Sequence, residues 1–175
     1  PDFLKGAQVS FVETSPLLRQ KQRAALAPYS KECSFKWYHT VETLLDSKRP
    51  LFLIATEFLD ALPFHQYRKI FSETTSAFGW QERVIVVSKQ GDLAWHWKGV
   101  SASEQADLEK RIGSSAEDIL EISPQRCEAF LKIIRHIQSL GGAAFFIDYG
   151  DRILQGDTLQ AVKNHRYTPA LEAPG

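Results

Sequence analysis

The sequence predicts an α/β fold, in which mainly parallel strands alternate with helices, and three observations support this prediction. Short apolar runs suited to buried strands recur along the chain. Two of these runs lead into the pairs Ser15–Pro16 and Ser123–Pro124. Such pairs signal helix starts, because the serine hydroxyl accepts a bond from a free backbone N–H and proline loses nothing at the first helical position. Three strand ends carry an acid, at Glu13, Glu57 and Asp148.

The N-terminal part of the chain predicts two strands, each followed by a helix. Gln8–Val12 is a β-prone run, and the helix that begins at Pro16 should stop before Pro28. Ser34–His39 is a second candidate strand, and Val41–Leu45 adds a turn of helix. This order of elements is typical of an α/β unit.

Glu13 stands at the tip of the first predicted strand. Nucleotide-binding α/β proteins place a carboxylate at such a tip to accept hydrogen bonds from ribose hydroxyls. The alternatives are that Glu13 is merely solvated or caps the following helix. The spacing alone leaves these roles open.

The element around which the chain is organised is the apolar run Leu51–Ala55, which predicts a strand buried on both faces, as in parallel sheets. Thr56, Glu57 and Asp60 follow just past its carboxyl end. In open α/β sheets ligands bind at that edge, because the strand stops there while the surrounding loops form a crevice. The alternative is that Glu57 and Asp60 cap a short helix.

Three extended runs then predict an antiparallel β meander, residues 64–98, inserted into the α/β framework. Residues 64–71, 80–88 and 93–98 are strand-like, and Gly91 lies in a hairpin-turn signal between the last two. Trp95 and Trp97 would share one face at the period of two. We interpret that face as packing rather than as a ligand-stacking surface.

The C-terminal part repeats the opening pattern. A short helix is expected near Asp107–Ile112, and Ile119–Ile122 leads into the helix that begins at Pro124 and ends at Gly141–Gly142. Ala143–Ile147 predicts another buried strand. The tail after this strand has weak periodicity, and we expect loop with one short helical piece.

Composition restricts the functional classes. The chain has 175 residues, enough for one domain, with 21 basic and 21 acidic side chains and no basic stripe, so a nucleic-acid partner is not expected. No apolar run approaches the roughly 18 residues that span a bilayer. The two cysteines and five histidines are dispersed, so no metal site is expected. Glycine-rich phosphate loops and nucleophile-elbow motifs are absent from these residues.

The residues alone therefore indicate an α/β nucleotide-type fold with an acidic crevice. This interpretation requires that the tips bearing Glu13, Glu57 and Asp148 converge on one edge of neighbouring parallel strands.

Three segments of the sequence, taken together, resemble those of one protein family. They are Val12–Pro16, then Glu57–Pro63 with Gln66, then Gly141–Gly150 with Asp157–Val162 and His165. In this order they are similar to the MidA-like S-adenosylmethionine-dependent methyltransferases. That family includes the mitochondrial complex I assembly factor that methylates a protein arginine, along with many bacterial members. The resemblance covers nearly the whole chain.

The resemblance implies a Rossmann-like class I methyltransferase sheet, S-adenosylmethionine as cofactor and a protein arginine as acceptor. Glu13 would hold the cofactor ribose, with Ser15 and Thr56 beside the cofactor. Glu57 and Asp60 would be the catalytic acids that grip the guanidinium, which a carboxylate matches in bidentate fashion. The residues implied for substrate binding are His65, Gln66, Asp148, Tyr149, Gln160 and His165.

The chain departs from the family pattern in two respects. Thr56 replaces the asparagine that usually precedes the acid of the Glu-Phe motif. The glycine-rich cofactor loop, the first strand of the sheet and the C-terminal end are expected outside residues 1–175. We therefore expect a partial methyltransferase domain, inactive by itself.

The resemblance further implies a protein substrate, such as a respiratory complex I subunit or its bacterial counterpart, and a mitochondrial-matrix or bacterial cytoplasmic location. Two other functions stay open. The chain is either a non-catalytic assembly or interaction module that keeps the fold, or an α/β enzyme that uses another adenosine cofactor.

Overall fold

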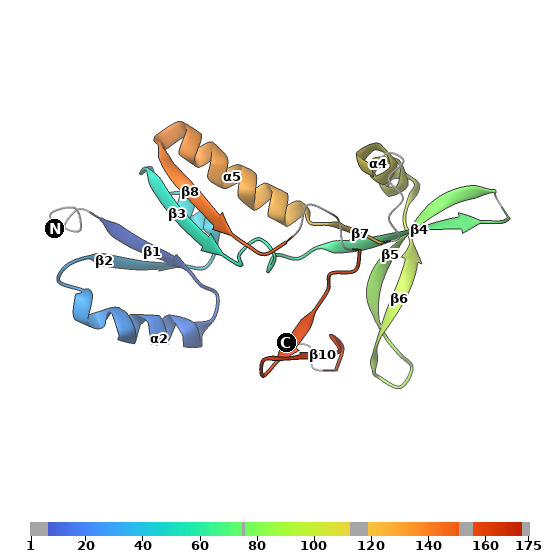
Figure 1. Ribbon diagram of the computed structural model, residues 1–175, viewed down its shortest axis with the longest axis horizontal. Helices are drawn as coiled ribbons and strands as arrows, with labels where there is room; N and C mark the ends of the chain where they lie inside the picture. Colours follow the sequence, from blue (N-terminus) through green and yellow to red (C-terminus); the bar gives the residue numbers. More distant parts are fainter. Residues whose placement is uncertain (1–6, 75, 113–118, 151–155, 173–175) are drawn as a thin grey trace. The chain divides into compact units, whose positions relative to one another are not determined.

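Two pairs of parallel strands and one four-stranded antiparallel sheet dominate the computed structural model, which describes residues 7–74, 76–112, 119–150 and 156–172 (Figure 1). The chain divides into two units. We call Pro1–Leu59 with Arg126–Asp148 the parallel unit, and Asp60–Gln125 with Tyr149–Gly175 the antiparallel unit. The predicted α/β class is confirmed.

The first pair of strands in the parallel unit is β1 (Gln8–Val12) and β2 (Ser34–Tyr38), which run parallel with Val12 opposite Tyr38. Between them lies α2 (Pro16–Leu26), continued by a single 3-10 turn at Ala27–Tyr29. Ser15 caps α2 as predicted, because its hydroxyl accepts a hydrogen bond from the Leu18 amide over 3.3 Å. A short helix, α3 (Val41–Leu45), follows β2.

The second pair is β3 (Leu51–Thr56) and β8 (Gly142–Ile147), parallel and paired along their full length. Helix α5 (Pro124–Leu140) precedes β8 and lies along the pair, with the rings of Phe130 and Phe146 5.3 Å apart (Figure 1). Ile133 of α5 is fully buried.

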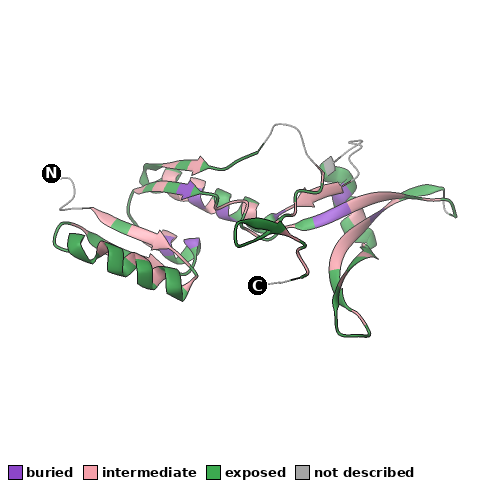
Figure 2. Ribbon diagram, turned by 60° about the horizontal axis from the view of Figure 1, so that its bottom comes forward, coloured by how far each residue is buried: buried purple, intermediate pink, exposed green. Residues whose placement is uncertain are grey.

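The predictions that β3 is buried on both faces and that β8 is a buried strand are wrong for the described residues. Ala55 is buried, but Phe52 is 78% exposed and Ile54 75% exposed, and Phe145 of β8 is exposed as well. Exposed residues recur along both strands of the pair (Figure 2). The reason is that α5 covers one face of the pair, whereas no element of the described parallel unit covers the other. An apolar run predicts a strand but does not report what packs on it.

The antiparallel unit contains β4 (His65–Ser72), β5 (Ala77–Val87), β6 (Leu93–Gly99) and β7 (Ile119–Ile122), in the order β6-β5-β4-β7. The three extended runs predicted between residues 64 and 98 are thus consecutive antiparallel strands. Their status as an insertion in a larger sheet stays a prediction.

The core of the antiparallel unit lies on one face of this sheet. Tyr67 of β4 and Trp80 of β5 are buried together with Leu108 of α4 (Ala102–Ile112), with Leu120 and Ile122 packed against them. Helix α4 begins earlier than the predicted segment Asp107–Ile112, because its polar first turn shows little apolar periodicity.

The tail forms a hairpin rather than the predicted loop with a helical piece. Strands β9 (Ala161–Lys163) and β10 (Arg166–Thr168) pair antiparallel around Asn164 and His165. Both turn residues have positive φ, 52° and 59°, as a type I′ hairpin turn requires. The strands are too short for a period of two to stand out in the sequence.

Candidate active site

The carboxyl edge of the β3–β8 pair brings two predicted site acids onto neighbouring parallel strands. Thr56, the last residue of β3, lies opposite Ile147, the last residue of β8, so Glu57 and Asp148 both follow at the same edge. The Glu57 amide donates to the Ile147 carbonyl over 2.9 Å and so extends the ladder by one bond. This edge is where α/β sheets bind ligands.

Glu57 has a backbone conformation that is unusual for its residue type. Its φ is +48°, in the left-handed region that costs an L-residue about 1 kcal/mol or more. Its side chain is exposed and forms no hydrogen bond or ion pair within the described part of the chain. A strained backbone that presents an available carboxylate at a ligand-binding edge is typical of functional sites.

The loop that follows Glu57 contains no helix, so the alternative that Glu57 and Asp60 cap a short helix is excluded. Side chains hold this loop instead. Arg126 Nε donates to the Leu59 carbonyl over 2.8 Å within the parallel unit. The Ser123 hydroxyl donates to the Pro63 carbonyl over 2.6 Å within the antiparallel unit.

Glu13 follows β1, and its carboxylate lies at the N-terminus of α2. Oε1 accepts from the Ser15 amide over 2.8 Å, and Oε2 accepts from Gln22 Nε2 over 3.4 Å. Glu13 therefore does interact with the helix start, as one alternative expected. A carboxylate offers about four acceptor positions, so both oxygens retain capacity for further donors. The predicted convergence of Glu13 with Glu57 and Asp148 stays a prediction.

The remaining predicted site residues lie in the antiparallel unit. The Nδ1 atom of His65, at the start of β4, is 2.6 Å from Glu82 Oε1. Tyr149 and Gln160 are exposed, and exposed His165 lies in the turn between β9 and β10. Gln66 is buried, with 4% of its surface exposed.

Gln66 is instead the centre of a polar network that sequence reasoning missed. Its Nε2 donates to Glu121 Oε1 of β7 and to Asp157 Oδ1 of the tail, each over 2.8 Å. Its Oε1 accepts from Arg83 of β5 over 3.0 Å, and the same Arg83 nitrogen lies 2.7 Å from Asp157 Oδ2. Glu121 in turn accepts from the amide and hydroxyl of Thr158. We call these five residues the Gln66 network.

The network shifts the pKa of Asp157. Burial is the largest influence and favours the protonated form, but hydrogen bonds from Gln66, Arg83 and the Leu159 amide, together with the Arg83 charge, outweigh it. The pKa of Asp157 is therefore held below its ordinary value. The signal available in the sequence was alternation with a period of two, because Gln66, Arg83 and Glu121 occupy one face of the sheet.

Two arginine–tryptophan contacts lie on this same sheet face. The Arg83 guanidinium is 4.1 Å from the centre of the Trp95 ring, and that of Arg68 is 4.4 Å from Trp97. Arg68 also donates to Gln81 from two nitrogens. The tryptophan rings therefore pack against arginines of neighbouring strands, and the stacked Arg83 has a fixed guanidinium plane.

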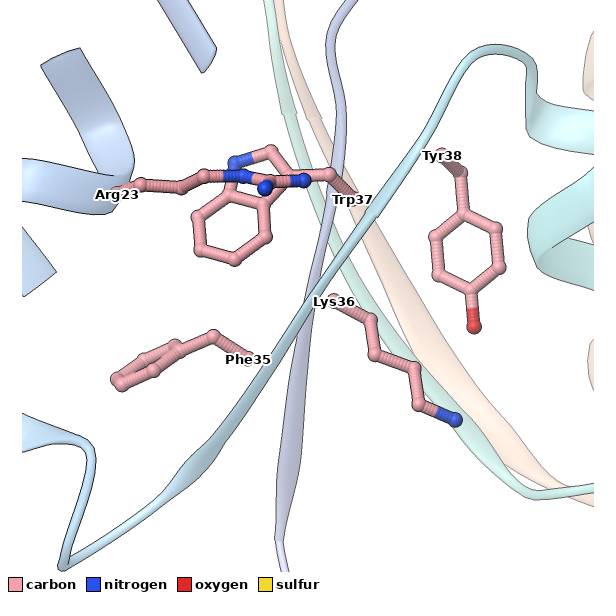
Figure 3. A pocket seen from close by; sticks show the side chains of 5 residues that line it. All are labelled: Arg23, Phe35, Lys36, Trp37 and Tyr38. Atoms are coloured by element: carbon pink, nitrogen blue, oxygen red, sulfur yellow. The ribbon is translucent and has the colours of Figure 1, made fainter. Parts of the chain in front are cut away.

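A hollow of about 370 Å³ lies along β2 and contains none of the predicted site residues. Phe35 and Trp37 point to one side of the strand and Lys36 and Tyr38 to the other, while Arg23 of α2 covers the Trp37 ring (Figure 3). These contacts pack α2 on β1 and β2, and we assign the hollow no function.

Within the described ranges, His, Cys, Asp and Glu nowhere form a group of three that could hold a metal. The same part of the chain has no helix with the length and apolar character needed to cross a membrane.

A model of the family of S-adenosyl-L-methionine-dependent methyltransferases matches residues 1–175. The chain is 29% identical, over 98% of its length, to the protein arginine methyltransferase NDUFAF7 homolog, mitochondrial, of Caenorhabditis elegans. It is 28% identical, over 97% of its length, to protein arginine methyltransferase NDUFAF7, mitochondrial, of Danio rerio. The chain spans less than half of these relatives, 43% and 42% of their respective lengths.

A solved structure shares the fold. A Burkholderia thailandensis protein bound to S-adenosyl-homocysteine superposes on 82% of the chain with a TM-score of 0.53, at 19% identity and over 34% of its own length. Because the family model matches along the entire chain, the chain belongs to the MidA-like family of S-adenosyl-L-methionine-dependent methyltransferases.

Proposed function

We propose that the chain is part of an S-adenosylmethionine-dependent methyltransferase that acts on a protein arginine. The observation that carries this proposal is the available Glu57 carboxylate, presented by a strained backbone at the carboxyl edge of β3 and β8. The names of the arginine-methylating relatives support the acceptor class.

Glu57 and Asp60 are proposed to hold the acceptor guanidinium. A planar guanidinium matches a carboxylate through two parallel N–H···O bonds, which fixes the plane and the orientation of the guanidinium. Alignment of one nitrogen with the methyl donor is mainly positioning, so neither acid needs to be a strong base. Asp148, which follows the neighbouring strand β8, adds a carboxylate to the same edge as Glu57.

Glu13, Ser15 and Thr56 are the residues proposed to hold the cofactor, which supplies an electrophilic methyl group on a sulfonium. The residues present fit this role. Glu13 directly follows a parallel strand, and its two oxygens keep acceptor positions beyond those used by Ser15 and Gln22, as two ribose hydroxyls would need. Thr56 ends β3, next to Glu57.

We further propose that a strand of the full-length protein lies between β1 and β3. In the described residues β1 pairs with β2 alone and β3 with β8 alone, so each has one unpaired edge in the parallel unit. Buried unpaired backbone groups are unfavourable, and one parallel strand would satisfy both edges. The meander, residues 64–98, is then an insertion in this sheet.

The acceptor is proposed to be a protein of the respiratory complex I or its bacterial counterpart, in a mitochondrial matrix or a bacterial cytoplasm. His65, Tyr149, Gln160 and His165 are proposed to contact it. The exposure of all four residues supports this role, since acceptor contacts require accessible side chains.

The test uses the full-length protein with methyl-labelled S-adenosylmethionine and a synthetic peptide that holds one arginine. We expect label in methylarginine after acid hydrolysis, identified by mass spectrometry. Cofactor binding without transfer to any protein or peptide would favour the non-catalytic module. Displacement of the cofactor by a dinucleotide, with no methyl transfer, would favour an enzyme with another adenosine cofactor.

A further inference from the structure

We propose that Gln66, Arg83 and Glu121 form a clamp that positions the tail for acceptor binding. The clamped segment is 156–160, which we call the strap, and it leads directly into the β9–β10 hairpin. Gln66 is thereby a positioning residue rather than a direct substrate contact.

The hydrogen bonds of the Gln66 side-chain amide support this positioning role. A side-chain amide has two N–H donors, and both are used, one for Glu121 and one for Asp157. The amide oxygen accepts from Arg83. Because Gln66 is also buried, its amide has no free donor with which to bind a substrate, whereas it links two strands to the strap.

The strap is hydrogen-bonded to β4 and β5 through one residue and to β7 through the next. Asp157 binds Gln66 and Arg83, which lie on β4 and β5. Thr158 donates its amide and its hydroxyl to Glu121, on β7. Arg83 is itself fixed by the Trp95 ring 4.1 Å away, so its guanidinium is preorganised for Asp157.

The charge balance makes Gln66 the critical member of the clamp. Two carboxylates, Glu121 and Asp157, converge on one amide nitrogen, and Arg83 is the one cation bonded within the Gln66 network. Without the amide, two like charges would face each other without their shared donor. Loss of Gln66 should therefore free the strap from the sheet rather than merely weaken its attachment.

The link to acceptor binding rests on the proposed function, in which Gln160 and His165 contact the acceptor. Gln160 ends the strap, and His165 lies in the hairpin turn beyond it. A released strap would leave both side chains without a fixed position. The clamp should consequently control the affinity for the acceptor and leave the methyl-transfer step and cofactor binding unchanged.

The first test is hydrogen–deuterium exchange of the full-length protein, followed on peptides that cover residues 156–172. Gln66→Ala should accelerate exchange in the strap by about tenfold or more, as expected for partly buried hydrogen bonds that are lost. Gln81→Ala is the matched control, because Gln81 lies on the same sheet face and bonds Arg68 but no strap residue. Equal exchange in both variants would overturn the clamp.

Thr158→Val provides a second variant if Gln66→Ala does not fold. It removes only the hydroxyl bond to Glu121 from an exposed residue, and should accelerate exchange in the strap by a smaller factor. Unchanged exchange in a folded Thr158→Val protein would also contradict the proposal.

The second test measures kinetics with the one-arginine peptide and labelled S-adenosylmethionine. Gln66→Ala should raise the peptide KM about tenfold and leave kcat and the cofactor Kd within about twofold. If exchange in the strap is faster but the peptide KM is unchanged, the clamp has only a structural role and the proposed link to acceptor binding is wrong. A fall in kcat at constant KM would also contradict that link. If the wild-type protein transfers no methyl group, the proposed function fails while the exchange comparison still decides the clamp.

Discussion

Gln66 Nε2 donates a hydrogen bond to Asp157 Oδ1 over 2.8 Å, although the two residues are 91 positions apart in the sequence. Both residues belong to the sequence segments on which the family resemblance rests. Gln66 follows Pro63, and Asp157 precedes the tail hairpin. The structure joins these two segments directly, because Gln66 supplies a donor that the Asp157 carboxylate accepts.

The pKa of Asp157 should rise when Arg83 is replaced by glutamine. Burial alone raises this pKa, and the bonds from Gln66 and Arg83 lower it below its ordinary value, so the loss of one bond and of the Arg83 charge shifts the balance upward. The measurement is an NMR titration of the Asp157 side-chain carbonyl carbon. Arg68→Gln is the control, since Arg68 stacks on Trp97 on the same face without bonding Asp157. An equal rise in both variants would contradict the assignment.

The same pKa sets the direction of a pH effect on stability. Because the folded pKa of Asp157 is depressed, its ionised form adds stability that is fully present above the unfolded pKa of about 4 and is lost as pH falls through the folded value. We expect strap exchange, corrected for intrinsic rates, to accelerate over this acidic range. Protection that increases on acidification would be inconsistent with this sign.

Replacement of Glu57 by glycine should give a more stable protein than replacement by alanine. Both variants lack the carboxylate, but only alanine retains a Cβ at a φ of +48°, which is unfavourable by about 1 kcal/mol or more. The measurement is thermal unfolding of the two full-length variants. A more stable alanine variant, as at an ordinary position, would show that Glu57 is not strained.

Glycine-to-alanine substitutions around β8 should form a graded series in the free energy of unfolding. Gly142 has a φ of +122°, and an added Cβ would lie 1.9 Å from the Leu51 carbonyl oxygen, so Gly142→Ala should disrupt the β3–β8 pairing. Gly141→Ala meets open space at a φ of +85° and should cost about 1 kcal/mol. Gly99→Ala, with open space and no positive φ, is the control. Equal losses at Gly141 and Gly142 would refute the close approach.

The 175-residue chain by itself should bind S-adenosylmethionine poorly. The glycine-rich loop and the strand proposed between β1 and β3 would both come from the full-length protein, and the exposed Phe52 and Ile54 leave one face of β3 uncovered. Calorimetric titration of S-adenosylmethionine into this chain and into the full-length protein compares the two affinities. Micromolar affinity for the isolated chain would show that the cofactor site is complete within these residues.

Local signals in the sequence predicted the secondary structure well. The Ser15–Pro16 pair fixed the start of α2, and Gly141 fixed the end of α5, because capping and positive φ depend on neighbouring residues alone. The tail hairpin was not predicted, since its strands have three residues each and its turn is Asn164–His165 without glycine.

Long-range features could not be predicted in the same way. The run Leu51–Ala55 has the composition of a doubly covered strand, but its exposure depends on which elements pack on it. The Gln66 network joins β4, β5, β7 and the strap, and nothing local in the sequence pairs Gln66 with Asp157. The edge that carries Glu57 and Asp148 was predicted, because parallel strands end at a common edge.

The most direct test of the proposed function is methyl transfer by the full-length Glu57→Gln protein. The amide keeps the size of the side chain but removes the charge that pairs with a guanidinium, so we expect transfer to arginine to fall at least about a hundredfold. The Kd for S-adenosylmethionine should stay near that of the wild type, and Glu32→Gln, at an exposed position outside the site, should keep full activity. Full transfer by Glu57→Gln would contradict the account.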